Sequence, residues 1–440
     1  MVWSSTASRC STGEVGCESP TKGGENLVSH LLTALLKRSF RPFEFVSGRS
    51  RDEDKPGSGL GLYVHIPFCT TLCDFCPYYK EKYRAELMPR FADALRQEIK
   101  TAGDRYGRLP VVSVYYGGGS PFLAIDELPA IQESVHEAFD VRGPTGIELN
   151  PDDVTSDTPD RLAAAGFNMA SIGIQSFHTG MLASLGRPRR DRADAVATMH
   201  DAGFSVVDVD LIFGLPNQTN ADIRSDFLRA AGAGATQIST YPFIDFSYSA
   251  NRVRPRSRGG KRRLLSALLE AADQAGFERT SIWTFARKGT ARYSSVTRDS
   301  YIGFGPSAAS LLESSFSVNV FSVTEYVNVI TRGDSPTALM ARLAPRDRAL
   351  LWLFWNTYNL KLDRSAFRTQ FGTPIERLFG PELSVARFFG LLERAGDTYL
   401  LTRGGAYLFH LLEQLYTKQY IDKVWRASML SPWPDRLVIQ

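Results

Sequence analysis

The sequence predicts an α/β fold whose core is a parallel sheet. From residue 61 onward, short apolar runs of β type alternate with longer helical patterns, and this alternation is typical of βαβ units. Six such units follow one another, fewer than the eight of a closed barrel. After Leu343 the pattern changes to helices rich in aromatic residues, so the chain of 440 residues is expected to hold more than one domain.

Three segments precede the expected core. Residues 1–24 are rich in Ser, Thr and Gly and are expected to be disordered. Leucines between Leu27 and Leu36 recur at helical spacing, which predicts a short amphipathic helix. Residues 47–59 are polar and contain Pro and Gly, as is typical of a linker. Residues 1–58 are therefore expected to form a disordered leader, a short helix and a linker.

The core is expected over residues 59–342, and its elements follow in order. The expected strands are 61–66, 111–116, 146–149, 170–175, 206–213 and 237–243. The expected helices are 85–99, 125–138, 158–165, 192–202, 221–231 and 261–275. Ligands bind at the carboxyl ends of parallel strands, so polar motifs at these strand ends are the candidates for a functional site.

The C-terminal unit is expected over residues 343–440. It contains two aromatic-rich helical patterns, 350–355 and 388–393, and a turn that enters a helix over 401–412. Aromatic side chains serve packing more often than cofactor binding, so these are interpreted as core residues.

Composition excludes several classes of partner. The 51 basic and 47 acidic residues leave a net charge of only +4, which gives no overall field for binding nucleic acid or a membrane. No apolar run has the length of a membrane span, and the start lacks the pattern of a secretory signal. Cys10 and Cys17 in the leader form no disulfide framework, which fits a reducing compartment. A cytoplasmic protein is expected.

Three cysteines form the most informative motif. Cys69, Cys73 and Cys76 lie within eight residues, spaced Cys-x3-Cys-x2-Cys. Thiolates select iron–sulfur clusters, zinc or copper(I). Three thiolates on one loop suit a [4Fe–4S] cluster whose fourth iron keeps an open position. A Cys3His zinc site that includes His65, or three unliganded cysteines, are the alternatives that ligand chemistry alone leaves open.

Cys-x3-Cys-x-Phe-Cys after a short apolar strand resembles the signature of the radical S-adenosylmethionine (SAM) enzymes. The preceding segment, Tyr63-Val-His-Ile-Pro-Phe68, is similar to the branch related to oxygen-independent coproporphyrinogen III oxidase. The resemblance implies a partial (β/α)6 barrel, closed by a small helical or winged-helix-like C-terminal domain. It implies that the open iron chelates SAM, and that one electron cleaves SAM to methionine and a 5′-deoxyadenosyl radical. An electron donor such as flavodoxin or ferredoxin is then needed.

The same resemblance assigns residues to SAM. Glycines at the end of the second strand let the backbone approach a ligand, although any tight turn could use them. Glu148 could accept bonds from ribose hydroxyls, or could be a solvated residue at a strand end. Asp210 lies in an apolar strand and needs a partner, and the guanidinium of Arg187 suits a carboxylate. The implied cofactor-binding residues are Tyr63, Phe75, Gly118, Gly119, Ser120, Glu148, Gln175, Arg187, Asp210 and Ala309, the last near a second SAM molecule.

At two positions the sequence differs from motifs of this branch, and these differences indicate which member group it resembles. Coproporphyrinogen oxidases usually carry a further cysteine two residues after the third ligand, where this chain has Tyr78. Haem-chaperone relatives carry a His-Asn-x-x-Tyr-Trp motif, where residues 292–298 have neither His nor Trp. The local sequence around Cys76 and Tyr293 is most similar to that of the class C radical SAM methyltransferases.

That similarity implies two SAM molecules and transfer of a methyl or methylene group to an sp2 carbon of a natural-product intermediate. The product would be C-methylated or cyclopropanated, and the acceptor an unsaturated or heteroaromatic small molecule. A partner methyltransferase, which some cyclopropane-forming members use, is allowed. A porphyrin-acting enzyme such as coproporphyrinogen III dehydrogenase, and a non-catalytic haem chaperone, stay open as alternatives. Tyr241 and Tyr293 are candidate proton donors.

Overall fold

The computed structural model describes residues 43–48, 54–188, 190–248, 253–291 and 299–439. The expected leader over 1–24 and the expected helix around Leu27–Leu36 lie outside these ranges, as do Cys10, Cys17 and Tyr293. None of the helices in the described ranges combines the length and the hydropathy that a membrane span requires.

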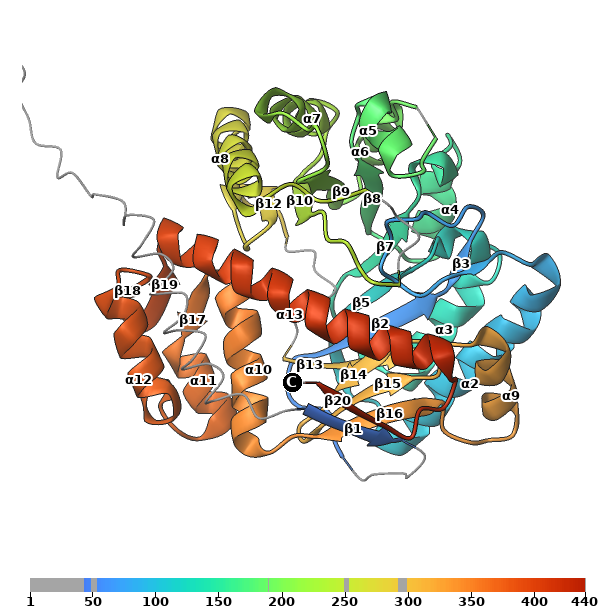
Figure 1. Cartoon of the computed structure of the whole chain (residues 1–440). Coiled ribbons are helices and arrows are strands. Elements are labelled where there is room, and N and C mark those ends of the chain that lie inside the picture. Colours follow the sequence, from blue (N-terminus) through green and yellow to red (C-terminus); the bar gives the residue numbers. More distant parts are fainter. Residues whose placement is uncertain (1–42, 49–53, 189, 249–252, 292–298, 440) are drawn as a thin grey trace, which may run out of the picture.

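The core is the expected partial barrel of parallel strands. Neighbouring strands pair in parallel in the order β2 (Leu60–Ile66), β5 (Pro110–Gly118), β7 (Thr145–Leu149), β8 (Met169–Gln175), β9 (Val206–Phe213) and β10 (Gln237–Pro242). The helices that follow them are α2 (Met88–Tyr106), α3 (Leu128–Ala138), α4 (Thr158–Ala164), α6 (Ala193–Asp201), α7 (Asn220–Gly232) and α8 (Arg258–Ala275), with the short α5 (Thr179–Ser184) before α6. These helices lie outside the curved sheet (Figure 1).

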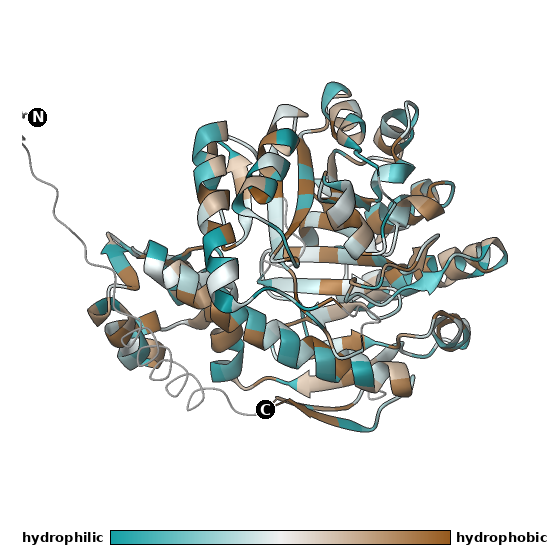
Figure 2. Ribbon diagram, turned by 45° about the horizontal axis from the view of Figure 1, so that its top comes forward, coloured by the Kyte–Doolittle hydropathy of each residue, from teal (hydrophilic) through white to brown (hydrophobic). Residues whose placement is uncertain are grey.

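Local sequence explains why these segments form these elements. In α7, Thr219 and Asp222 form a reciprocal capping box at the start of the helix. Ile223 and Phe227, four residues apart, are then buried on one face. Strand β9 is buried along nearly its whole length, as expected of a parallel strand that is covered on both faces. Figure 2 shows the result, with hydrophobic residues on the strands and hydrophilic residues on the outer faces of the helices.

The sheet continues beyond the six barrel strands, which the sequence analysis did not predict. Strand β13 (Ser300–Phe304) pairs in parallel with the free edge of β2. Antiparallel strands then follow in the order β14 (Ala309–Leu311), β15 (Ser315–Asn319), β16 (Thr337–Arg342), β1 (Phe43–Ser47) and β20 (Arg436–Ile439). The opposite edge carries β12 (Thr284–Arg287) and β11 (Phe277–Arg279). Residues 43–47, expected within the N-terminal segment 1–58 of leader, helix and linker, are thus a strand of the main sheet, and Phe45 is 1% exposed.

The C-terminal unit combines helices with a small sheet. Its elements are α10 (Pro345–Tyr358), β17 (Lys361–Asp363), α11 (Arg364–Phe371), α12 (Ile375–Phe388), β18 (Leu392–Ala395), β19 (Thr398–Leu401) and α13 (Arg403–Leu430). Strands β17, β19 and β18 form a separate three-stranded sheet. Trp352, Phe367 and Phe379 are buried in its core, as expected. The expected helix over 388–393 is wrong, because Gly390 adopts a left-handed conformation and ends it, leaving Phe388 85% exposed.

Helix α13 leaves this unit and crosses back over the sheet (Figure 1). It is 28 residues long and leads into β20, which pairs with β1. The expected core and C-terminal segments are therefore joined, since each contributes strands to the same sheet.

Candidate active site

The cysteine loop follows β2 at the carboxyl end of the barrel. Phe68, which is fully buried against Phe91, fixes the start of the loop. The Cys69 carbonyl accepts the Tyr83 amide at 2.9 Å, and strands β3 (Phe68–Cys69) and β4 (Glu81–Lys82) pair across the base of the loop. The thiols of Cys69, Cys73 and Cys76 are free and partly buried. The loop therefore holds three thiols at the end of the first barrel strand.

The donor set fits a cluster better than a single metal ion. Within the described residues, no group of three or more His, Cys, Asp or Glu side chains is gathered closely enough to hold one ion. Each thiolate of a cubane cluster binds a different iron, so the three sulfurs do not need to converge. Burial raises the pKa of the Cys69 thiol to about 12, and bound iron would supply the positive charge that deprotonates it.

His65 does not complete a Cys3His zinc site. Its Nδ1 lies 2.9 Å from the Tyr63 hydroxyl, and its Nε2 lies 3.2 Å from the Tyr79 carbonyl and 3.3 Å from the Ser307 hydroxyl. Burial lowers the pKa of His65 to about 4, so the ring is neutral. Both nitrogens are used in hydrogen bonds that join β2 to the segment after the cysteines and to the loop after β13.

The glycine loop after β5 packs directly on the cysteine loop. Gly119 donates its amide to the Ile66 carbonyl at 2.9 Å, and a Cβ at Gly119 would lie 2.3 Å from the Phe68 carbonyl oxygen. Gly118 has a φ of 119° and lies against the His65 ring. Ser120 donates its hydroxyl to Asp153. The glycines are thus needed for contact between the two loops, and their contact with SAM stays a prediction.

Three carboxyl groups lie inside the barrel on β7 and β9, the two strands that flank β8. We call Glu148, Asp208 and Asp210 the carboxylate cluster. The Glu148 carboxylate accepts the Tyr115 hydroxyl at 2.7 Å and the Gly118 amide at 3.1 Å. The remaining bonds of the cluster run from Ser171 to Asp210 at 3.1 Å, and from Gln237 at 2.9 Å and Ser239 at 2.8 Å to Asp208. Each carboxyl group therefore has a protein partner.

Burial raises the pKa of all three groups, and repulsion between carboxyl groups adds to this for Glu148 and Asp210. Burial raises the pKa of Asp208 to about 6 and also raises that of Glu148. Burial, followed by repulsion from Asp208 and Glu148, raises the pKa of Asp210 well above its usual value. Such a cluster favours a ligand that brings positive charge or hydrogen-bond donors. Sequence reasoning missed Asp208, although residues two apart on a strand share a face.

Gln175 and Arg187 lie together beside this cluster. Gln175 ends β8 with a φ of 68°, a conformation that non-glycine residues rarely adopt. Arg187 donates to the Gly173 carbonyl. Burial raises the pKa of Cys69 and of Asp210, and the charge of Arg187 offsets part of both shifts, so Arg187 lies near both groups. A small cavity of about 20 Å³ lies beside Arg187. The structure therefore brings Arg187 between the cysteine loop and the carboxylate cluster.

Phe75 and Ala309, implied for SAM, and Tyr241, the candidate proton donor, lie on different elements. Phe75 packs against Leu185, Ile212 and Phe243 at the ends of the strands, which gives it a packing role. Ala309 begins β14, close to Gly303 on β13. Tyr241 is the penultimate residue of β10, with 41% of its surface exposed, and burial and then Asp210 raise its pKa.

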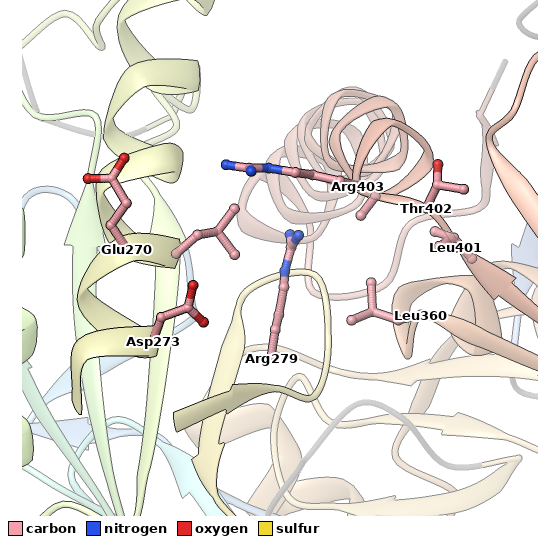
Figure 3. A pocket seen from close by; sticks show the side chains of 9 residues that line it. Glu270, Asp273, Arg279, Leu360, Leu401, Thr402 and Arg403 are labelled. Carbon is pink, nitrogen blue, oxygen red and sulfur yellow. The ribbon is translucent and has the colours of Figure 1, made fainter. Parts of the chain in front are cut away.

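A larger cavity lies away from these residues. It measures about 410 Å³ and lies between α8, the end of β11 and the start of α13. Figure 3 shows Arg403 extending toward Glu270, with Arg279 and Asp273 nearby. None of the residues implied for the cluster or SAM lines it.

Comparison with known proteins agrees with this geometry. The sequence model of the radical SAM superfamily matches residues 63–230. The chain is 23% identical to the haem chaperone HemW of Bacillus subtilis, over 79% of this chain and 96% of that protein. It is 29% identical to HemW of Mycobacterium tuberculosis, over 80% and 93%. It is 25% identical to the oxygen-independent coproporphyrinogen III oxidase of Salmonella typhimurium, over 82% and 85%.

The fold has a solved counterpart. The structure of coproporphyrinogen III oxidase (HemN) from Escherichia coli matches 88% of this chain and 98% of its own, with a TM-score of 0.71 and 22% identity. The prediction of a C-methylating or cyclopropanating enzyme is wrong, because these relatives are named for coproporphyrinogen oxidation or as haem chaperones and not for methyl transfer.

Proposed function

The chain belongs to the radical SAM superfamily, in its branch related to oxygen-independent coproporphyrinogen III oxidase, and from this membership we propose that it uses SAM to act on a porphyrinogen or a related tetrapyrrole. Its cofactors are those of the superfamily, a [4Fe–4S] cluster and SAM. One observation carries the choice of substrate. The relative named for coproporphyrinogen III oxidation matches 82% of the chain, far beyond the region of the superfamily model.

The following residues would bind the cluster and SAM. Cys69, Cys73 and Cys76 hold the cluster, which together with SAM supplies a hydrogen-abstracting radical. The carboxylate cluster accepts hydrogen bonds from SAM, and it also attracts the positive charges of the sulfonium and ammonium groups of SAM. The protein partners of the cluster hold its oxygens in place before SAM binds. Arg187, which lies near Cys69 and Asp210, pairs with the carboxylate of SAM.

The remaining residues shape the site. Gly118, Gly119 and Ser120 keep the backbone close to the cysteine loop. Tyr63, Phe75 and Gln175 line the space between the loop and the strands, and Ala309 lies by a second SAM molecule. A small redox protein such as flavodoxin or ferredoxin supplies the electron.

A haem carrier is the second candidate function. It is favoured by the 29% identity to a haem chaperone over 93% of that protein's length. It is disfavoured by residues 292–298, which contain no histidine for haem.

One experiment separates the two candidates. The protein is reconstituted anaerobically with iron and sulfide, reduced, and supplied with SAM, with or without coproporphyrinogen III. Deoxyadenosine is quantified by mass spectrometry, and tetrapyrrole products by fluorescence after oxidation. We expect deoxyadenosine to rise with coproporphyrinogen III and a changed tetrapyrrole to appear. An intact cluster that cleaves no SAM, together with stoichiometric haem binding, would establish the carrier instead.

A further inference from the structure

Helix α13 has a buried aromatic support near each end, and the residues between these supports contact further elements. Near its start, His410 accepts the Trp283 indole N–H at 2.7 Å and stacks on Phe213, with ring centroids 5.8 Å apart. Near its end, Trp425 packs on Phe321, with centroids 5.2 Å apart. His410 and Trp425 are separated by about 22 Å along the helix axis. We call residues 413–420, between the supports, the α13 span.

One side of this helix is fully engaged with the barrel. Gln414 accepts the Lys261 ammonium at 2.9 Å, Lys418 pairs with Asp245 at 3.1 Å, and Asp422 accepts the Ser247 amide at 2.9 Å. With His410, these residues recur every four positions and form one stripe. Their partners fix how the helix is rotated about its axis.

The other side packs on different elements. Tyr416 lies 4.8 Å from Phe354 of α10, and Tyr420 lies 5.9 Å from Phe316 of β15, both measured between ring centroids. Glu413 and Thr417 lie on the face between the two contacting sides, so this face is directed at the sheet.

The loop that α13 contacts also touches the segment after the cysteines. Tyr248, which follows Ser247, donates its hydroxyl to the Pro77 carbonyl at 2.8 Å, one residue beyond Cys76. Tyr79 packs in the same hydrophobic cluster as Trp425. The helix therefore spans from the loop after β10 to the segment after the cysteines.

The α13 span holds buried polar atoms that lack a partner. Glu413 is 5% exposed, and only one of its carboxyl oxygens is bonded, to the Thr417 hydroxyl at 2.6 Å. The other oxygen is buried with no partner, and so is the Tyr420 hydroxyl. A buried polar group without a partner is costly, and native proteins retain few of them. Burial raises the pKa of Glu413 to about 8. These groups are satisfied when a ligand supplies the missing partner.

The surroundings restrict what that ligand can be. The rings of Tyr416 and Tyr420 are parallel and 5.7 Å apart, and Tyr301 of β13 is close enough for Tyr416 to raise its pKa. A group that enters here meets aromatic faces beside a carboxyl acceptor. The pyrrole ring combines a flat apolar face with a single N–H donor.

We propose that Glu413 and Tyr420 on α13 bind pyrrole N–H groups of the tetrapyrrole, so that the α13 span recognises the substrate. This inference rests on the proposed function. It assigns substrate selection to a helix outside the barrel, while the strand ends hold SAM.

The test compares Glu413→Leu and Tyr420→Phe with Gln419→Ala, an exposed position on the same helix. Binding of coproporphyrinogen III to the reconstituted protein is measured anaerobically by ultrafiltration and by fluorescence after oxidation. We expect Glu413→Leu to raise the Kd at least about tenfold, because it leaves a buried pyrrole N–H without its acceptor. Its melting temperature should stay equal or rise, because an unpaired buried carboxyl is removed. Tyr420→Phe should act in the same direction, and Gln419→Ala should change neither quantity.

The outcomes separate the two proposals. Wild-type affinity for coproporphyrinogen III in Glu413→Leu would overturn the role of the α13 span and leave the proposed function standing. A wild-type protein that cleaves SAM but does not bind coproporphyrinogen III would overturn the proposed function and this inference with it. A lower melting temperature in Glu413→Leu with unchanged affinity would show that Glu413 is structural.

Discussion

The carboxylate cluster and the α13 span are two sets of buried polar groups that differ in one respect. Each carboxyl group of the cluster is bonded to side chains or amides of neighbouring strands. In the cluster only the Asp208 Oδ1 atom is buried without a partner, and the other contacts are made, whereas in the span both Glu413 and Tyr420 have an oxygen without one. The cluster is therefore arranged before any ligand arrives, which lowers the entropy cost of binding. The unpartnered atoms of the span gain their hydrogen bonds only when a ligand binds there.

The difference suggests separate selection of cofactor and substrate. A site for a ligand that is always used benefits from acceptors fixed in advance. A site for a larger molecule must open, and α13 is held to the barrel loop largely by polar contacts. The two regions can then be tested by variants that affect one and spare the other.

The largest effect on activity is expected from a substitution in the cysteine loop. Cys73→Ala should abolish the cluster and lower SAM cleavage by more than about 100-fold, because even residues that only support a metal ligand contribute 10- to 100-fold. Iron content, visible absorbance and deoxyadenosine yield measure the effect. Leu72→Ala, on the same loop and 48% exposed, is the matched control and should keep the cluster. Full activity of Cys73→Ala would show that the cysteine loop holds no catalytic cluster.

The second largest effect is expected when a hydrogen-bond donor of the carboxylate cluster is removed. Ser239→Ala removes one of the donors to Asp208, whose other oxygen is already buried without a partner. We expect the free energy of unfolding to fall by about 1–3 kcal/mol, measured by urea denaturation of the apoprotein. Glu413→Leu should show no such loss. Equal destabilisation by both variants would contradict the distinction between a prearranged and an incomplete site.

The stability of the protein should depend on pH differently through Asp208 of the cluster and through Glu413 of the span. Asp208 has a folded pKa of about 6 against a usual value of 3.8, and Glu413 one of about 8 against 4.5. In both groups folding favours the protonated form, so the stabilisation is full below the usual pKa and is lost as the pH rises to the folded pKa. Asp208 has largely completed this loss by pH 6.5, whereas Glu413 continues to lose about 1 kcal/mol per pH unit up to about pH 8.

Urea denaturation between pH 6.5 and 7.5 measures this difference. Glu413→Gln should flatten the fall in stability in that range, and Asp208→Asn should leave the slope near that of the wild type. Glu98, whose pKa burial raises to about 7, contributes equally to both variants. A slope that responds to Asp208→Asn and not to Glu413→Gln would contradict the assignment.

The smallest effect concerns the contact between α13 and the barrel. The Lys418–Asp245 ion pair is 3.1 Å long with both side chains about half exposed, so Lys418→Ala should cost less than about 1 kcal/mol. SAM cleavage without substrate should not change. A loss of stability well above this value would mean that this ion pair, rather than the buried contact of His410 with Trp283, holds the helix.

The parallel core could be predicted from the sequence because its strands are continuous apolar runs between helices. Strand β9 was predicted with its observed bounds for this reason. Strands β1 and β13 could not be found in the same way, because Tyr301 pairs with Gly61 and Phe43 with Ile439, far apart in the chain. Such pairing is not encoded in a local pattern.

The candidate site was predicted in part. Glu148 and Asp210 follow apolar runs and could be recognised, whereas Glu413 lies in a helix, where glutamate is usually solvated. The predicted methyl transfer was wrong because it rested on a few residues around Cys76, whereas a relative similar over four-fifths of the chain is named for coproporphyrinogen III oxidation.

The pairing of β1 with β16 and β20 has a consequence for biosynthesis. A chain leaves the ribosome from its N-terminus at about 5–20 residues per second. Strand β1 emerges early, while β16 and β20 follow roughly 290 and 390 residues later. During that interval Phe45 has no sheet to cover it and β1 presents an unpaired edge, the kind of surface that chaperones bind. Yield of folded protein should therefore depend on how long nascent chains are shielded during translation.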